Sequence, residues 1–384
     1  MFRLLSYPHY VRKSPCLLPA PDFKRLNITQ QSVASEVNMP AQDLTQLITP
    51  CLLLDRVKMT ANLERMRQQM NHIGGSLRPH VKTAKSANVL AHIFEDKNTA
   101  KICVSTIREA EYFSEAGYTD IMYAVAIAPN KLDAIVRLMQ TGTNLTIVLD
   151  NIETAQIVAA HGRQHKALFN FFIELDVDGH RSGVTPTDPA LLEIARFIDT
   201  TEGIKLAGVM THAGDSYNCT SIQGIRAMAE QERARSVAAA ESIRQAGITC
   251  PDVSVGSTPT ATYLESAEGI TEIRAGVFIF QDLFQAGINV CQESDIALSV
   301  LATVIGHQKS KNWVITDAGW MAMSRDRGTQ AQPKDQGYGL VCGINGEILI
   351  DDLIVVSANQ NCILSNKDAA ADKAEGERRG RRHS

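Results

Sequence analysis

The segment "SLRPHVKTAKSA", residues 76–87, has the pattern of a short strand that runs into a helix. Pro79 lies inside the strand, and Lys82 and Lys85 lie near its end. A lysine that follows a strand is far more often a solvated charge at the start of a surface helix than a catalytic amine. The segments that follow along the chain decide between these two interpretations.

Strand-like and helix-like segments alternate with short connections between residues 76 and 280. Several of the strand candidates are near-continuous apolar runs rich in Val and Ile, which is typical of parallel strands buried on both faces. Helices are predicted between them, for example over 130–140 and 227–247. The strand candidates are "SLRPHVK" (76–82), "AKICVST" (100–106), "DIMYAVA" (120–126), "NLTIVLD" (144–150), "FNFFIELDV" (169–177), "KLAGVMTHAG" (205–214), "DVSVGS" (252–257) and "TEIRAGVFIF" (271–280).

These strands and helices predict an α/β fold, a (β/α)8 TIM-type barrel over residues 46–283. A doubly wound open sheet is the alternative, but it does not normally need eight consecutive βα units. Shorter β-rich runs follow over 284–364 and predict a small C-terminal β-domain. The stretch "LITPCLLLD" (47–55) is also strand-like and could add to that sheet. Residues 1–45 are expected to be a disordered extension, with a transit peptide as the alternative, and 365–384 a disordered charged tail.

Composition excludes several classes of protein. The 384 residues are 44% hydrophobic and 21% charged with a net charge of -4, so no basic surface for nucleic acid is expected. No apolar run reaches the roughly 18 residues that a membrane span needs. The eight cysteines are scattered without CxxC spacing, which indicates free thiols in a reducing compartment. We therefore expect a soluble cytoplasmic protein.

In a barrel, chemistry collects at the carboxyl ends of the strands. Thr106 and Asp150 at these ends are explained as helix N-caps. For Lys82, His212 and the turn 256–258 that explanation fails or is incomplete. A lone histidine such as His212 is nevertheless more often a structural residue than a catalytic one.

The turn "GSTPT" (256–260) suggests an anion site, because it places a glycine and two hydroxyls before Pro259 at the start of a helix. Phosphate sites favour the loops after barrel strands seven and eight. Together with a lysine after strand one, this suggests a phosphorylated aldehyde held as a Schiff base, and hence pyridoxal 5'-phosphate. Lys82 must then titrate low, helped by burial and by nearby Arg78. Arg181 is either a surface charge or a donor to the pyridine nitrogen.

Six ordered motifs within residues 48–360 resemble the fold-type III pyridoxal-phosphate enzymes, specifically the D-threonine aldolase and D-serine dehydratase-like group. They are "TPCLLLD", "RPHVKTAK", "GVMTHAGDSY", "VSVGSTPT", "EIRAGVFIFQD" and "TDAGWMAMSRDRG". The resemblance implies an alanine racemase-like barrel followed by a β-domain. It also implies roles for individual residues: Lys82 as the Schiff-base lysine, His80 as its strand neighbour facing the site, His212 as the cofactor-proximal histidine, Tyr217 as a pocket tyrosine, Arg181 beside the pyridine ring, and Gly256, Ser257 and Thr258 as the phosphate cup.

By the same resemblance the chain is a lyase for β-hydroxy-D-amino acids, of the D-threonine aldolase, D-serine dehydratase or 3-hydroxy-D-aspartate aldolase type. A divalent metal, Zn or Mn, and a homodimer are implied as well. The alternatives are a pyridoxal-phosphate amino-acid racemase, with Lys82 and a tyrosine as its acid/base pair, and a cofactor-binding protein that has lost catalysis.

Two positions depart from the family pattern. Ala84 replaces the histidine of the usual "KTHK" motif. The C-terminal stretch "SANQNCILSNKDAAADK" (357–373) lacks the His-x-Cys or His-x-Asp motif that carries the metal ligands in the family. Since no metal ligands are found in the sequence, we expect cofactor binding with turnover impaired by this altered, apparently truncated end.

Overall fold

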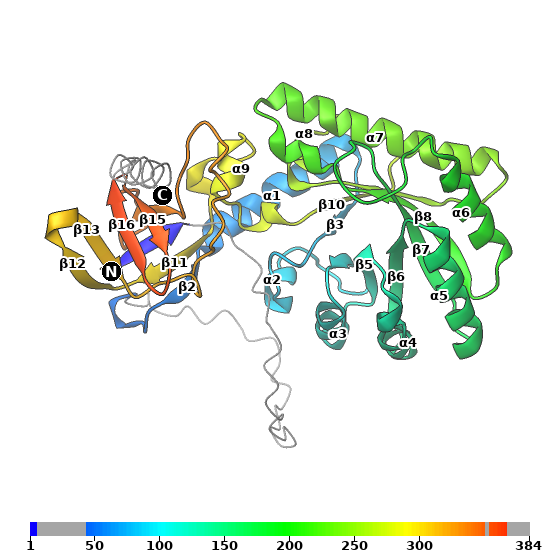
Figure 1. Cartoon of the computed structure of the whole chain (residues 1–384), viewed down its shortest axis with the longest axis horizontal. Coiled ribbons are helices and arrows are strands. Elements are labelled where there is room, and N and C mark those ends of the chain that lie inside the picture. Colours follow the sequence, from blue (N-terminus) through cyan, green and yellow to red (C-terminus); the bar gives the residue numbers. More distant parts are fainter. Residues whose placement is uncertain (6–43, 350–352, 367–384) are drawn as a thin grey trace, which may run out of the picture. The chain divides into compact units, whose positions relative to one another are not determined.

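The computed structural model describes residues 1–5, 44–349 and 353–366. These residues divide into two compact units, and each contains one eight-stranded sheet (Figure 1). The first unit comprises 54–298 with 331–334. The second comprises the described parts of 1–53, 299–330 and 335–384.

The sheet of the first unit is a parallel barrel. Its strands are β3 (Leu77–Pro79), β4 (Lys101–Val104), β5 (Asp120–Ala126), β6 (Asn144–Leu149), β7 (Phe169–Leu175), β8 (Ile204–Thr211), β9 (Asp252–Val255) and β10 (Glu272–Ala275). They are neighbours in chain order, and β10 pairs with β3. A parallel bridge between His80 and Cys103 joins the end of β3 to β4. The predicted (β/α)8 barrel is therefore confirmed, and the alternative of a doubly wound open sheet is excluded.

Helices surround the strands (Figure 1). They are α1 (Arg56–Ile73), α2 (Ala87–Leu90), α3 (Ile107–Glu115), α4 (Leu132–Gln140), α5 (Ile152–His165), α6 (Pro189–Thr200), α7 (Ile222–Gln245), α8 (Thr258–Tyr263) and α9 (Leu283–Gly287). Thr106 caps α3 as predicted, because its hydroxyl accepts from the Glu109 amide at 3.1 Å. Asn151, and not Asp150, caps α5, since the Asn151 side chain accepts the Thr154 amide.

The strand side chains alternate between two environments, as the pleat requires. One set packs under the helices in the main hydrophobic core; examples are Ile102, Ile121 and Ile147. The alternate positions of β4 to β8 form a separate apolar cluster inside the barrel: Cys103, Met122, Val148, Phe172 and Met210.

Inside the barrel, β3, β9 and β10 contribute polar side chains instead. Arg78 Nε donates to Glu272 Oε2 and Arg78 Nη1 to Asp120 Oδ1, both at 2.7 Å. Ser254 Oγ donates to the other oxygen of Glu272 at 2.7 Å and accepts from Arg274 Nη1 at 2.6 Å. Arg78 is 4% exposed and Glu272 1%. Charges buried this deeply persist because each is paired and hydrogen-bonded.

The second unit is a β-domain with the strand order β12-β13-β16-β15-β14-β1-β11-β2. The strands are β1 (Phe2–Leu5), β2 (Cys51–Leu54), β11 (Leu298–Ala302), β12 (Val304–Gln308), β13 (Trp313–Thr316), β14 (Leu340–Cys342), β15 (Leu353–Ala358) and β16 (Cys362–Asn366). Its core contains Leu4, Val300, Val341, Val355 and Leu364. The stretch 47–55 supplies β2 at the edge of this sheet, as predicted.

The predicted residue ranges differ from these units at three points. Residues 2–5 of the expected extension form β1, which pairs with β11 and β14, whereas 6–43 lie outside the described residues. Ser365 and Asn366 end β16, and 367–384 lie outside the described residues. The barrel unit continues to 298 rather than 283, because the backbone of Ala297 bonds Phe280 and Asp55 at 2.8 Å each.

Two expectations from composition can be compared with the described part of the chain. None of its helices is long and apolar enough to cross a membrane. The seven cysteines within it are free thiols, and Cys16 lies outside it.

The buried ion pair generates a stability prediction. Arg78→Met leaves Glu272 charged and unpaired inside the barrel, so we expect the free energy of unfolding to fall by about 3–5 kcal/mol. Urea denaturation followed by circular dichroism measures the loss, because helices α1 to α9 belong to the unit that contains Arg78. The matched control is Arg108→Met, which removes an exposed pair with Glu111 and should cost under about 1 kcal/mol. Equal effects of the two substitutions would contradict the role given to Arg78.

Candidate active site

The end of β3 places His80 where the barrel closes. Its amide donates to the Ala275 carbonyl on β10 at 2.8 Å. The Lys82 amide donates to His80 Nδ1, and His80 Nε2 lies 3.4 Å from Ser105 Oγ. Because Nδ1 accepts, the ring proton is on Nε2 and faces the serine. His80 is therefore held as one defined neutral tautomer at the carboxyl end of the strand.

The pKa of Lys82 is lowered, as predicted, but the largest cationic contribution comes from Arg181. Its pKa is lowered by burial and next by the charge of Arg181, while Glu109 acts in the opposite direction. Arg78, the cation expected from the sequence, is not among the largest influences on this pKa, and it pairs with Glu272 and Asp120. A lysine in such surroundings carries a larger neutral fraction than usual, which is the nucleophilic form.

His212 follows β8, and its Nδ1 lies 3.0 Å from the Gly256 carbonyl. A carbonyl only accepts, so Nδ1 carries the proton and Nε2 offers its lone pair. Burial, reinforced by Arg181, lowers the pKa of His212 to about 3. Burial also lowers the pKa of His80, reinforced by Lys82. Both imidazoles are thus neutral at physiological pH.

Tyr217 and Ser216 connect the loop after β8 to its neighbours. The Tyr217 ring lies 6.0 Å from the His212 ring. The Ser216 hydroxyl lies 3.0 Å from that of Ser257. The loop therefore brings the predicted pocket tyrosine to His212 and also holds the turn at 256–258.

The turn at 256–258 requires glycine at its first position. Gly256 has φ +124°, and a Cβ there would lie 2.3 Å from the Arg274 carbonyl oxygen. Its amide donates to Glu232 at 3.0 Å, and the Ser257 amide donates to Thr260 Oγ1 at 3.0 Å. Ser257, and not Thr258, is the N-cap of α8. Both of these amides already donate to protein acceptors. Phosphate binding at this turn therefore stays a prediction, and other groups would have to bind the phosphate.

Thr258 joins the ends of two neighbouring strands. Its hydroxyl accepts from the Val277 amide at 3.1 Å. Val277 follows β10, so the loops after barrel strands seven and eight are held together at this residue. These are the loops where the sequence predicts the phosphate.

Arg181 lies in the loop after β7 and is exposed, but the aliphatic part of its side chain packs on Gly214. Its charge lowers the pKa of both Lys82 and His212, so its guanidinium lies within electrostatic reach of both. The structure thus gathers His80, Lys82, Arg181 and His212 at one end of the barrel.

Two positioning residues were missed by sequence reasoning. Glu232 of α7 accepts from the amides of Ala213 and Gly256 at 2.9 and 3.0 Å, so it aligns the ends of β8 and β9. Burial raises the pKa of Glu232. Arg274 donates to the Thr211 carbonyl, directly before His212. A signal existed for Glu232, because it interrupts the buried stripe of α7 formed by Ile225, Ala229, Ser236, Ala239 and Ile243.

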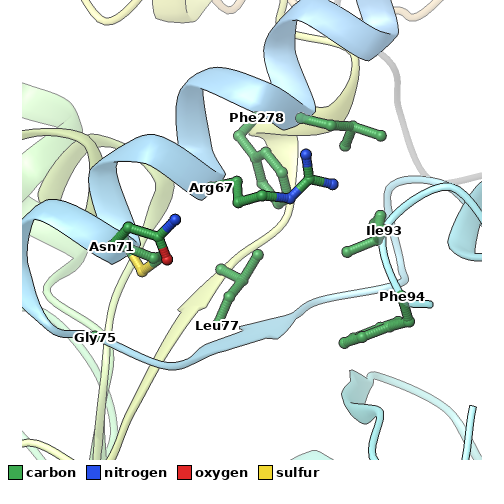
Figure 2. A pocket seen from close by; sticks show the side chains of 9 residues that line it. Arg67, Asn71, Gly75, Leu77, Ile93, Phe94 and Phe278 are labelled. Carbon is green, nitrogen blue, oxygen red and sulfur yellow. The ribbon is translucent and has the colours of Figure 1, made fainter. Parts of the chain in front are cut away.

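A cavity of about 200 Å³ lies elsewhere in this unit, against α1 and β3 (Figure 2). Leu63, Arg67, Leu77, Phe94 and Phe278 are among its lining residues. None of the predicted site residues lines this cavity.

The side chains of the described C-terminal stretch, residues 357–366, do not fit a metal ion. Cys362 begins β16, is fully buried, and burial raises the pKa of its thiol to about 12. Gln360, two residues earlier, lies exposed in the β15–β16 turn. Among the residues that the structure describes, the only group of three ligand side chains within coordinating distance is Asp133, His161 and His165, on α4 and α5.

The barrel and the β-domain each match a known family. Residues 54–283 match the alanine racemase N-terminal domain, and 297–378 match a putative serine dehydratase domain. The chain belongs to the alanine racemase N-terminal domain family.

Several relatives of this chain are lyases. The chain is similar to D-threo-3-hydroxyaspartate dehydratase of Delftia sp., at 48% identity over 330 residues that cover 86% of each chain. The solved structure of that enzyme superposes with a TM-score of 0.82 and covers 85% of this chain and 86% of that one. D-serine dehydratase of Dictyostelium discoideum is 29% identical and covers 76% of this chain and 78% of its own.

An aldolase is also among the family relatives. 3-Hydroxy-D-aspartate aldolase of Paracoccus denitrificans is 27% identical and covers 76% of each chain. The family, the lyase class and the dehydratase or aldolase type expected from the motifs are therefore confirmed. Alanine racemases of Clostridium difficile share 14 to 16% identity, which demonstrates a common fold alone.

The neutral histidines generate a pH prediction. Below pH 6.5 the unfolded chain protonates His212, while the folded chain does not until about pH 3. Stability conferred by this group is thus lost as the pH falls through this window, by about 1.4 kcal/mol per pH unit. His212→Asn should flatten the difference in the free energy of unfolding between pH 7 and pH 5, measured by urea titration. His72→Asn, at an exposed site, is the control; identical slopes in wild type and H212N would contradict the assignment.

Proposed function

We propose that this chain is a pyridoxal-phosphate lyase for β-hydroxy-D-amino acids, and that D-threo-3-hydroxyaspartate is the first substrate to test. The observation that carries the proposal is the position of Lys82. It lies half-buried beyond β3, with Arg181 and Arg274 close enough to lower its pKa. Similarity to the Delftia dehydratase supports the substrate class.

The side chains at this site fit the cofactor. Its phosphate and phenolate are anionic, and Arg181 and Arg274 both act electrostatically on His212 and Lys82. A bound anion stabilises cationic side chains that are gathered at one site. Lys82 would hold the aldehyde carbon, and the loops joined by Thr258 and Val277 would hold the phosphate.

When bound, pyridoxal phosphate accepts the electron pair left at the substrate Cα, which dehydration and aldol cleavage share. Lys82, with its lowered pKa, is the base that takes a proton at Cα in dehydration. His212 keeps its proton on Nδ1, bonded to Gly256, and therefore presents an acceptor and not a positive charge. His80 presents Nε2–H towards Ser105 and can donate a hydrogen bond without changing the charge of the site.

Metal dependence is the point at which this chain differs from relatives. An alanine variant of a cysteine in the Delftia enzyme is described in a metal-free form, which links a metal to that protein. Here the described C-terminal residues do not fit a metal, so we assign no step to one. The second candidate function, cofactor binding without turnover, is favoured by this same observation.

A homodimer in a reducing, cytoplasmic environment completes the proposal. The dimer is supported by the family resemblance and by apolar side chains at the edge of the β-domain sheet: Ile48 and Leu52 are 91% and 66% exposed. The environment is supported by seven free cysteines among the described residues.

Lys82→Ala should abolish the visible absorption band of the bound cofactor, because no amine remains to hold the aldehyde carbon. Absorption spectra after reconstitution with pyridoxal phosphate measure the effect. Lys85→Ala, three residues away and paired with Glu109, is the control and should keep the band. An unchanged band in K82A would refute the assignment of Lys82.

The wild-type chain should release a keto acid and ammonia from D-threo-3-hydroxyaspartate, and dialysis against EDTA should leave the rate unchanged. A coupled keto-acid assay with and without added Zn²⁺ or Mn²⁺ measures this; glycine and an aldehyde would indicate cleavage instead. A band that shifts with substrate while no product forms would establish the second candidate. A rate restored only by metal would contradict the assignment of the C-terminal turn.

A further inference from the structure

The outer helices of the barrel carry a cluster of ligand side chains that the proposed reaction does not use. His161 and His165 lie one helical turn apart on α5, so both imidazoles project from the same face. Asp133, the second residue of α4, reaches this face from the neighbouring helix. His161 Nε2 lies 3.1 Å from Asp133 Oδ1, and His165 Nε2 lies 4.0 Å from the same oxygen.

The three ligand atoms are spaced almost as a metal ion requires. Nitrogen and oxygen ligands bind Zn²⁺ at about 2.0–2.2 Å, so two ligands of a tetrahedral site lie roughly 3.3 Å apart. One pair already meets this spacing, and the atoms all lie within 4.8 Å of one another. His165 and Asp133 are exposed, so a rotamer change can close the remaining gap without disturbing the core.

A second observation singles out His161. Its Nε2 atom is buried and has no hydrogen-bond partner among the described residues, although Asp133 Oδ1 is 3.1 Å away. The carboxylate is therefore near the nitrogen but is not aligned as a hydrogen-bond acceptor. A buried polar atom without such a partner is costly. A cation placed between the three ligand atoms would satisfy it.

We propose that Asp133, His161 and His165 form a binding site for a divalent transition metal such as Zn²⁺, which links α4 to α5. Two imidazoles and one carboxylate are a ligand set that suits Zn²⁺, and water would complete the coordination. The residues lie on the outer helices, away from the carboxyl ends of the strands. The metal therefore has a structural role and takes no part in the lyase reaction.

The simpler explanation is an ion pair between Asp133 and the two histidines, which needs no metal. The ring centroids of His161 and His165 are only 4.2 Å apart. A pair of protonated imidazoles at this separation repels, whereas two neutral imidazoles on one cation do not. Metal binding at neutral pH therefore distinguishes the two explanations.

The test is calorimetric titration of Zn²⁺ into the full chain after EDTA treatment and removal of the chelator. Wild type should bind one equivalent of Zn²⁺ at this site. In His165→Gln and in His161→Gln this binding should be lost, or its affinity reduced at least about tenfold, because each substitution removes one of three protein ligands. Asp133→Asn should reduce the affinity for the same Zn²⁺ ion. Zn²⁺ should also raise the melting temperature of wild type but not of H165Q.

Two controls locate the site. His72→Gln, at another exposed histidine, and Cys362→Ser should leave this equivalent unchanged. Substituted Co²⁺ should give weak visible bands without an intense thiolate band. Lyase activity and circular dichroism of the cluster variants should match wild type, since these residues lie outside the proposed active site. The proposal is overturned if wild type binds no Zn²⁺ at millimolar concentration, or if H161Q and H165Q bind it as wild type does.

Discussion

A chain of buried charged and polar side chains crosses the inside of the barrel, and the geometry of the candidate site depends on it. Arg78 joins Asp120 to Glu272, and Ser254 joins Glu272 to Arg274. These residues come from four strands, β3, β5, β9 and β10. An unpaired charge in this interior would cost about 3–5 kcal/mol, so a shift in register between these strands would destabilise the barrel. The register that results places Arg78 opposite Arg274 where β3 meets β10.

This arrangement also influences which cations act on Lys82. Arg78 forms ion pairs with two carboxylates and is not among the largest influences on the pKa of Lys82. Arg181, from an exposed loop, and Arg274 have that effect instead. The site is consequently positive and its histidines are neutral, which favours an anionic ligand and an uncharged amine. Neutral imidazoles also avoid adding further positive charge beside Lys82.

The two proposals place cofactor chemistry and metal binding at separate sites of this chain. In the described C-terminal residues, Cys362 is buried with a raised thiol pKa, and Gln360, two residues earlier, is exposed. The proposed cluster of Asp133 and His161 lies instead on the helical layer of the barrel. A metal bound there would link α4 to α5 and take no part in the lyase reaction.

The sequence alone was sufficient to predict the barrel, the added strand at 51–54 and a cofactor role for Lys82, because apolar runs, turns and ordered motifs are local signals. It did not reveal the partner of Arg78, the role of Glu232 or the convergence of Asp133 with the histidines of α5. Each of these depends on which distant segments the closed barrel places side by side. Burial and electrostatic pairing arise only from that placement, so tertiary structure alone decided the charge state of the site.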